Sequence, residues 1–339
     1  MKIAYASIYD NLYGQDRVFD EKSCNIGQNL LYPLIKLRDE LNKLGHSLHT
    51  ADLYHSFLDV DYIIFADLSP KYLRVCNSLR SFARYIYKRG WKSDYLNKAI
   101  KEIPLEKRLL VIAEPPSVIP TSYDKKYHKF FHKVLTWNDD LADGRKYIKY
   151  CIPQPVPNID VNEVAHENKR FLTMICGNKS SKYENELYSE RKKIIEFCEK
   201  HSCQFDLYGF GWENCNYSNY KGTVADKLQV LSNYKYSICY ENMCNINGYI
   251  TEKIFDCFFS HCVPVYYGAE NITDYIPKET FIDARNFSSI HELISCLNSI
   301  SLEKYREYIY NARQFIVSSG FKKQFSVDAY VNSIIHQIL

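Results

Sequence analysis

The sequence lacks any hydrophobic run long enough to cross a membrane. A transmembrane helix needs about 20 consecutive apolar residues, and no stretch of the 339 residues approaches that length. We therefore expect a cytoplasmic protein. The 12 cysteines include no CxxC pair, which fits scattered thiols in a reducing compartment better than a disulfide framework.

Other features are scarce as well, and each scarcity argues against a class of function. No GxGxxG motif follows the first predicted strand, which argues against a dinucleotide-dependent dehydrogenase. A net charge of +3 is too small to indicate a nucleic-acid-binding protein. Cys198, His201 and Cys203 are the densest group of metal-ligand types, but without a paired CxxC we favour ordinary thiols over zinc. We predict no metal site and no cofactor.

What is present is an alternation of short apolar strands with amphipathic helices. Residues 2–7, 47–51 and 62–65 have the composition of strands, and leucines at helical spacing predict a helix over residues 29–44. A second series begins with the predicted strand 171–176. Such alternation is typical of a parallel, doubly wound α/β sheet.

The length and the proline distribution predict two domains. A chain of 339 residues can form two cores, and its 46% hydrophobic and 24% charged residues are those of a globular protein. Spaced prolines make residues 153–168 the expected linker. We predict two Rossmann-like α/β domains, residues 1–152 and 169–339, facing each other across a cleft.

The stretch 236–287 directs polar residues toward the start of a helix. An apolar strand over 236–240 is followed by Asn247-Gly248, and Thr251 can cap a helix with an apolar face made by Ile254, Phe255, Phe258 and Phe259. Helix N-termini attract phosphates, and Lys253 adds a full positive charge. Glu252 projects about 100° away, so the two side chains can hold different parts of a ligand, such as a ribose and a phosphate. The alternative is an ordinary capped helix with both side chains in solvent.

The same stretch resembles the sugar-nucleotide-binding motif of the α-1,3-fucosyltransferases, glycosyltransferase family ten. The matching features are Glu241-Asn242, residues 249–253, the Val-Pro-Val before Gly268, and Phe281-Ile282. Several elements in fixed order are more specific than a lone glycine motif. The resemblance implies a GT-B fold, a GDP-sugar donor such as GDP-fucose bound by the second domain, and a glycan or lipid-linked glycan acceptor held by the first. It also implies inverting, metal-independent transfer.

Glu114 is the candidate catalytic residue. The predicted strand 109–113 delivers this carboxylate to the end of a sheet, where α/β proteins bind ligands. Family members carry Glu-Ser-Pro or a similar triplet here, and its glutamate is held to be the general base. This chain has Glu114-Pro115-Pro116 instead. A salt-bridged loop glutamate is the alternative.

The resemblance also assigns the donor-binding residues. Asn178 and Arg191 match family positions that contact the donor. Arg191 at a predicted helix start is unusual, because cations are disfavoured at the positive end of the helix dipole unless an anion joins them. With Lys253 it would hold the diphosphate, and Glu252 would accept hydrogen bonds from the ribose. The remaining residues expected to fix phosphate, sugar or base are Asn178, Asn242 and Tyr249.

Two departures leave alternatives open. The loop from Glu241 to Lys253 is about one residue longer than in close bacterial relatives and places Cys244-Asn245-Ile246 near the expected sugar. The donor could therefore be another GDP-deoxyhexose, or the protein could bind a sugar nucleotide without catalysis. Asp59-Val60-Asp61 matches the Asp-x-Asp metal motif of other glycosyltransferases, but such triplets are frequent by chance, so an exposed loop is favoured.

Arg80, Arg84 and Lys88 recur at helical spacing, with aromatic residues between them. Such a stripe is most simply a solvated helix face. The alternative is a surface that docks on anionic membrane lipid or on a lipid-linked acceptor.

Overall fold

The computed structural model describes residues 1–24, 29–68, 95–157 and 165–339. The basic stripe of Arg80, Arg84 and Lys88 lies outside these residues. The chain forms two compact units. The first contains most described residues up to Tyr150 together with Tyr330–Leu339, and the second contains Cys151–Ala329. The end of the chain thus belongs to the unit that its beginning forms.

The first unit is built on a six-stranded sheet in the order β2-β1-β3-β4-β5-β6. All neighbouring strands are parallel. The strands are β1 (Lys2–Ser7), β2 (Ser47–Thr50), β3 (Tyr62–Ala66), β4 (Arg108–Ile112), β5 (Lys133–Thr136) and β6 (Tyr147–Lys149). The order reverses between β1 and β3, and ligands of open α/β sheets bind at the carboxyl ends of strands beside such a switch point.

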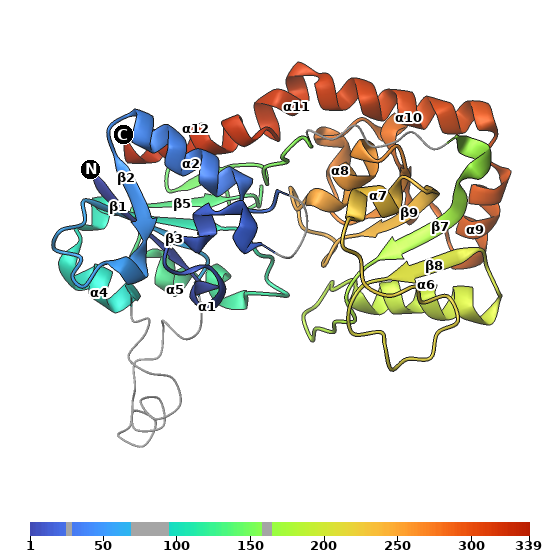
Figure 1. Ribbon diagram of the computed structural model, residues 1–339, viewed down its shortest axis with the longest axis horizontal. Helices are drawn as coiled ribbons and strands as arrows, with labels where there is room; N and C mark the ends of the chain where they lie inside the picture. Colours follow the sequence, from blue (N-terminus) through green and yellow to red (C-terminus); the bar gives the residue numbers. More distant parts are fainter. Residues whose placement is uncertain (25–28, 69–94, 158–164) are drawn as a thin grey trace. The chain divides into compact units, whose positions relative to one another are not determined.

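Helices cover both faces of this sheet (Figure 1). They are α1 (Asp10–Tyr13), α2 (Tyr32–Lys43), α4 (Tyr95–Glu102), α5 (Lys125–His128) and α12 (Val327–Ile338). Ile63 packs in one core with Leu96 of α4, whereas the Tyr62 hydroxyl donates to the Gln337 carbonyl of α12 at 3.1 Å. Successive strand residues point to opposite faces, so α4 and α12 lie on opposite sides.

The second unit is built on a five-stranded parallel sheet in the order β11-β10-β9-β7-β8. Its strands are β7 (Arg170–Ile175), β8 (Phe205–Tyr208), β9 (Tyr234–Tyr240), β10 (Val263–Tyr267) and β11 (Ile282–Asp283). Here the switch point lies between β7 and β9. Both units are doubly wound and Rossmann-like, which confirms the predicted fold class.

Two hydrophobic cores sandwich the second sheet. Its helices are α6 (Tyr188–Lys200), α7 (Lys227–Leu231), α8 (Glu252–Phe259), α9 (Ile290–Ser299), α10 (Leu302–Val317) and α11 (Ser319–Gln324). The predicted apolar face of α8 packs with Phe315 of α10 and Phe321 of α11. The opposite core joins Ile194 of α6 to Leu293 of α9. The helix expected after Thr251 therefore exists and buries the face that its spacing predicts.

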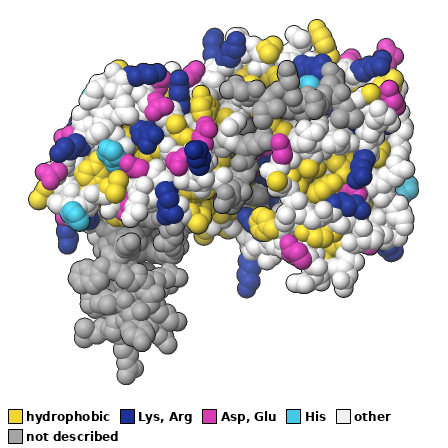
Figure 2. Space-filling model, viewed as in Figure 1, with side chains coloured by type: hydrophobic (Ala, Val, Ile, Leu, Met, Phe, Trp, Pro, Cys, Tyr) yellow, Lys and Arg dark blue, Asp and Glu magenta, His cyan; other side chains and the backbone are white. Residues whose placement is uncertain are grey.

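The described surface is mixed in charge. On the face drawn in Figure 2, Lys and Arg side chains are interspersed with Asp and Glu over both units. Within the part of the chain that the structure describes, no helix combines the length and the apolarity needed to span a bilayer.

Candidate functional site

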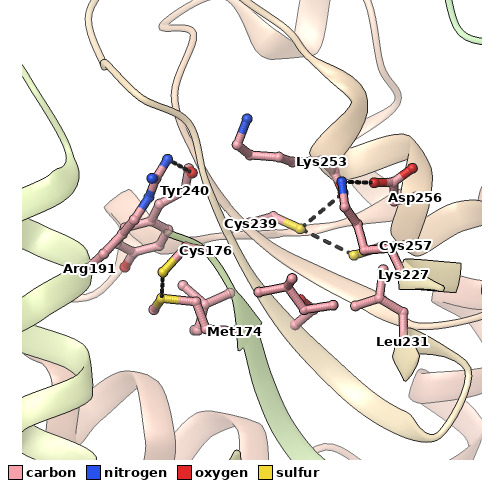
Figure 3. A pocket seen from close by; sticks show the side chains of 13 residues that line it. Met174, Cys176, Arg191, Lys227, Leu231, Cys239, Tyr240, Lys253, Asp256 and Cys257 are labelled. Atoms are coloured by element: carbon pink, nitrogen blue, oxygen red, sulfur yellow. Dashed lines mark hydrogen bonds and ion pairs between the residues drawn. The ribbon is translucent and has the colours of Figure 1, made fainter. Parts of the chain in front are cut away.

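A small pocket lies at the switch point of the second sheet. Its walls come from β7, β9, α6, α7 and α8 (Figure 3), and its volume is about 30 Å³. Three cationic side chains line it: Arg191 of α6, Lys227 of α7 and Lys253 of α8. Two of these, Arg191 and Lys253, are predicted donor-binding residues. The tertiary structure brings them together from segments 62 residues apart in the sequence (253 − 191).

Arg191 is fixed by oxygen atoms at the end of β9. Its Nη2 donates to the carbonyl of Tyr240 at 2.6 Å and to Oδ1 of Asn242 at 3.0 Å. The residue is only 5% exposed. These two acceptor oxygens partly offset the unfavourable position of the Arg191 cation near the positive end of the α6 dipole. They also place the predicted residue Asn242 directly beside Arg191.

Lys253 is held by a buried carboxylate. Its Nζ lies 3.2 Å from Oε2 of Glu241 and 2.9 Å from Oγ1 of Thr251. Glu241 has no exposed surface, and it also accepts hydrogen bonds from the Thr251 amide at 2.8 Å and the Thr251 hydroxyl at 2.7 Å. Burial works to lower the pKa of Lys253, but Glu241 and Glu252 outweigh it and raise that pKa. The lysine is cationic at neutral pH.

Thr251 does not perform the capping role expected of it. It occupies the N-cap position of α8, but its side chain makes no capping hydrogen bond. The hydroxyl instead donates to Glu241, because a fully buried carboxylate requires hydrogen-bond donors. Gly268 permits the arrangement, since a Cβ there would lie 2.5 Å from Cγ of Glu241.

Lys227 and Asp256 are site residues that the sequence reasoning missed. Lys227 Nζ lies 2.7 Å from Oδ2 of Asp256 and 3.9 Å from Oε1 of Glu252. Burial opposes the charge of Lys227, but these carboxylates raise its pKa. The side chain of Glu252 is 50% exposed. Loss of solvent around the carboxylate works to raise the pKa of Glu252, but the charges of Lys253 and Lys227 lower it to about 2. A lysine at the start of the five-residue helix α7 gave no sequence signal of its own.

The other four predicted donor residues do not line this pocket: Asn242 and Glu252 contact its cations Arg191 and Lys227, whereas Asn178 and Tyr249 lie elsewhere. The Asn178 side-chain amide donates to the Gly211 carbonyl at 2.8 Å and so joins the loops after β7 and β8. Tyr249 is 2% exposed. The pocket instead contains sulfur atoms, with Sγ of Cys239 3.2 Å from Sγ of Cys257. Burial raises the pKa of both thiols well above the usual range, so both thiols are protonated and unreactive at neutral pH.

Glu114 follows β4 in the first unit and is held at three of its atoms. Its Oε1 accepts a hydrogen bond from the Tyr9 hydroxyl at 3.0 Å. Its main-chain carbonyl accepts from the Tyr123 hydroxyl at 3.0 Å. Its main-chain amide donates to Oδ2 of Asp67 at 3.1 Å. Tyr9 follows β1, Asp67 follows β3 and Glu114 follows β4, so all three lie at the carboxyl edge of the sheet beside its switch point.

Asp67 is a residue of this cluster that the sequence reasoning missed. It is 3% exposed, and its φ of 61° lies in the left-handed region, which Asp tolerates better than most residues. Its Oδ1 accepts hydrogen bonds from the Ala113 amide at 3.2 Å and from the Ser122 hydroxyl at 2.9 Å. Burial, and then the charge of Glu114, raise the pKa of Asp67 to about 7.

Metal-ligand geometry is not found at the positions considered from the sequence. Among the described residues, no group of three or more His, Cys, Asp or Glu side chains could hold a metal ion. Asp61 accepts a hydrogen bond from the Lys2 amide at 2.7 Å, so it stabilises the amino end of β1. Asp59 is exposed, which agrees with the favoured interpretation of an exposed loop.

Residues 168–332 match the family model described as glycosyltransferase family 10 (fucosyltransferase), C-terminal part. An α-(1,3)-fucosyltransferase of Helicobacter pylori is 28% identical over 199 residues, 54% of this chain and 38% of that protein. The mouse 4-galactosyl-N-acetylglucosaminide 3-α-L-fucosyltransferase 9 is 24% identical over 227 residues, 66% of this chain and 55% of that protein. The aligned regions thus span about a third to a half of these relatives.

A solved structure shares the fold. The crystal structure of an α1,3-fucosyltransferase with GDP has a TM-score of 0.58 and 15% identity, covering 100% of this chain and 90% of that one. The matched family region contains the pocket with Arg191 and Lys253, whereas Glu114 lies outside it.

Proposed function

The chain belongs to glycosyltransferase family 10 (fucosyltransferase), and from this premise we propose that it moves fucose from GDP-fucose to a hydroxyl group of a glycan acceptor, in an α-1,3-type linkage. The observation that supports this most directly is the pairing of Arg191 and Lys253 at the switch point of the second sheet. Two cations fixed by buried oxygen atoms form a site for a diphosphate.

The pocket residues suit the leaving group of such a reaction. A volume of about 30 Å³ holds one or two water molecules, not a nucleotide. We therefore place the oxygen atoms of the diphosphate at its mouth, against Lys253, Arg191 and the start of α8. The half-exposed carboxylate of Glu252 accepts hydrogen bonds from the ribose. Lys227 adds a third charge that the resemblance did not supply.

The mechanism is inverting and needs no metal ion. Glu114 takes the proton of the acceptor hydroxyl while that oxygen attacks the anomeric carbon from the side opposite the diphosphate. The bond from the anomeric carbon to the diphosphate oxygen breaks, and GDP leaves with the electron pair. Arg191 and Lys253 stabilise the charge that develops on this oxygen, as a metal ion does in other enzymes.

The loop near the expected sugar supports a second donor. The Cys244 amide donates to the Asn185 carbonyl at 2.9 Å, so the insertion is anchored to the segment before α6. Cys244 is buried, but Asn245 is exposed with a φ of 56°. An exposed amide here can distinguish substituents of the sugar, so GDP-deoxyhexoses other than GDP-fucose are candidate donors. A sugar-nucleotide-binding protein without catalysis is the alternative from another class.

Incubation with sugar nucleotides separates these possibilities. GDP-fucose, GDP-mannose and UDP-galactose are supplied separately with 4-galactosyl-N-acetylglucosamine, the acceptor named for the mouse relative. We expect transfer from GDP-fucose, and stabilisation by GDP of about 2.7 kcal/mol at 100 times its Kd, with none from UDP. Equal stabilisation by both nucleotides contradicts the proposal. Binding without transfer to any acceptor of a glycan panel favours the non-catalytic alternative.

The proposed location is the cytoplasm, with the Arg80, Arg84, Lys88 stripe as the proposed dock on anionic lipid. Sedimentation with phosphatidylserine vesicles tests the stripe, because attraction between exposed charges is screened beyond about 10 Å at 0.1 M salt. Binding that is lost as salt rises, and lost when all three residues become Ala, supports the dock. Binding that survives the triple substitution leaves the stripe as a solvated face.

A further inference from the structure

We infer that Asp67 is the positioning residue of Glu114: its buried carboxylate holds the turn after β4 and thereby sets the direction of the Glu114 side chain. The inference rests on the proposed role of Glu114 as general base. It adds a residue from a different strand, 47 positions earlier in the sequence.

The contacts of Asp67 begin where the sheet ladder ends. Ala66 pairs with Val111 in the parallel register of β3 and β4, and the Asp67 amide continues the ladder by donating to the Val111 carbonyl at 2.9 Å. The carboxylate then crosses the end of β4. One oxygen accepts the amide of Ala113 and the other accepts the amide of Glu114.

The local sequence explains why the turn needs this acceptor. Pro115 and Pro116 have no N–H group, so Ala113 and Glu114 provide the last two backbone donors of the segment. Asp67 engages both of them. The carbonyl groups of this turn are held separately, by the Tyr123 hydroxyl at Glu114 and by the amides of Val118 and Ile119 at Pro115, so Asp67 holds the amide side of the turn. A small rotation at Glu114 would carry its carboxylate away from the acceptor hydroxyl. The contacts of Asp67 thus fix the Glu114-Pro115-Pro116 turn, where this chain departs from the family's Glu-Ser-Pro triplet.

A carboxylate serves here better than an amide would. An ionised Asp is acceptor-only and offers lone pairs on both oxygens. Asp67 receives three donors: the two amides and the hydroxyl of Ser122. Ser122 in turn accepts from the Leu68 amide at 2.9 Å, so its hydroxyl proton is directed to Asp67. An Asn side chain would set its NH₂ group against one of these donors.

The titratable groups around Asp67 come from several elements. The charge of Asp67 helps to raise the pKa of Tyr9 after β1, Tyr150 after β6 and Tyr330 on α12. It also interacts with the charge of Glu114. His128 of α5 contacts the Ser122 carbonyl through Nε2 at 2.8 Å. Protonation of Asp67 removes one acceptor of an amide, so the turn loosens as Asp67 takes up a proton.

The test compares Asp67→Asn with a matched control, Asp61→Asn. Both residues flank β3 and both accept a backbone N–H, but Asp61 lies at the amino end of the sheet. With GDP-fucose and 4-galactosyl-N-acetylglucosamine, we expect kcat of Asp67→Asn to fall by about 10- to 100-fold. The Kd for GDP should stay within twofold, and Asp61→Asn should transfer at the wild-type rate. A wild-type rate in a folded Asp67→Asn protein overturns the inference.

A double-mutant cycle separates positioning from general stability. If Asp67 acts through Glu114, adding Asp67→Asn to Glu114→Gln should slow transfer no further. If the two losses multiply, Asp67 acts independently and the inference is wrong. The pH profile gives a second readout, because the wild-type rate should rise through about pH 7 and Asp67→Asn should lose that rise.

Two outcomes need separate assignment. If Glu114→Gln itself transfers at the wild-type rate, the proposed base is wrong, whatever Asp67 does. If Glu114→Gln is inactive and Asp67→Asn is fully active, only the positioning role fails. Should Asp67→Asn not fold, Ser122→Ala removes one donor and keeps the charge; a partial fall in kcat supports the inference, and an unchanged kcat and pH profile contradict it.

Discussion

The ammonium group of Lys253 lies 3.2 Å from Oε2 of Glu241, a carboxylate with no exposed surface. The lysine side chain is 23% exposed, so the pair joins the interior of the second unit to its ligand pocket. Because Glu241 already fixes the ammonium group, the Lys253 side chain loses little conformational freedom when an anion binds from the solvent side. The pocket is therefore organised before the proposed diphosphate ligand binds.

Because Glu241 is fully buried and Lys253 is partly exposed, replacing one or the other should lower the free energy of unfolding by different amounts. Lys253→Met leaves Glu241 charged and buried without its cation, which should cost about 3–5 kcal/mol. Glu241→Gln leaves a lysine that can turn to solvent, and should cost about 1–3 kcal/mol. Urea unfolding measures both. Lys304→Met, which breaks an exposed pair with Glu307, is the control and should change little; a Lys253→Met protein as stable as wild type would show that the buried pair contributes nothing.

Arg191 should dominate the affinity for the nucleotide. Arg191→Lys keeps the charge but cannot bind the Tyr240 carbonyl, Asn242 and a phosphate in one plane. We expect the Kd for GDP, measured by calorimetry, to rise by about 10- to 100-fold. Lys193→Ala, on the exposed face of the same helix, should leave the Kd unchanged. Equal effects of the two substitutions would mean that long-range charge, and not the fixed position of Arg191, determines binding.

Glu114→Gln should abolish most transfer without affecting donor binding. The amide keeps the size and can still accept from Tyr9, but it cannot take the acceptor proton. We expect kcat to fall by about 100-fold or more, with the Kd for GDP within a few-fold. Glu106→Gln, at the amino end of β4, is the matched control. If both variants transfer at the wild-type rate, another carboxylate must be the base.

The stability of the first unit should depend on pH through Asp67. Its pKa is about 7 in the folded protein and 3.8 ordinarily, so between these values the folded state binds a proton that the unfolded state has lost. The free energy of unfolding should therefore fall as pH rises from about 4 to 7, by up to about 1.4 kcal/mol per pH unit. Urea unfolding at several pH values should show this slope in the wild type and a shallower slope in Asp67→Asn. Identical slopes would mean that Asp67 does not titrate in this range.

Transfer should survive treatment with EDTA, because Arg191 and Lys253 supply the charge that a metal ion would. The measurement compares the rate before and after chelation and gel filtration. A complete loss of activity that manganese restores would contradict metal independence and return Asp59 and Asp61 to consideration as ligands.

Local sequence pattern determined the elements and the positions of Lys253 and Glu114 within them. Apolar spacing places the α8 helix at residues 252–259, so Lys253 could be placed at a helix start. The short apolar run of β4 likewise placed Glu114 at a strand end. These inferences succeed because periodicity reports the local backbone geometry that decides where a side chain leaves its element.

The tertiary structure alone decided the partners. Strand order sets β3 beside β4 and so brings Asp67 to Glu114, and the packing of α7 on α8 brings Lys227 to the pocket. Burial of Glu241 redirected the Thr251 hydroxyl from its helix to a carboxylate, and burial of Tyr249 removed a predicted ligand from the pocket wall. A hydrogen bond or an ion pair between distant segments depends on which strand ends adjoin and which groups lose water, and neither is a property of the local sequence.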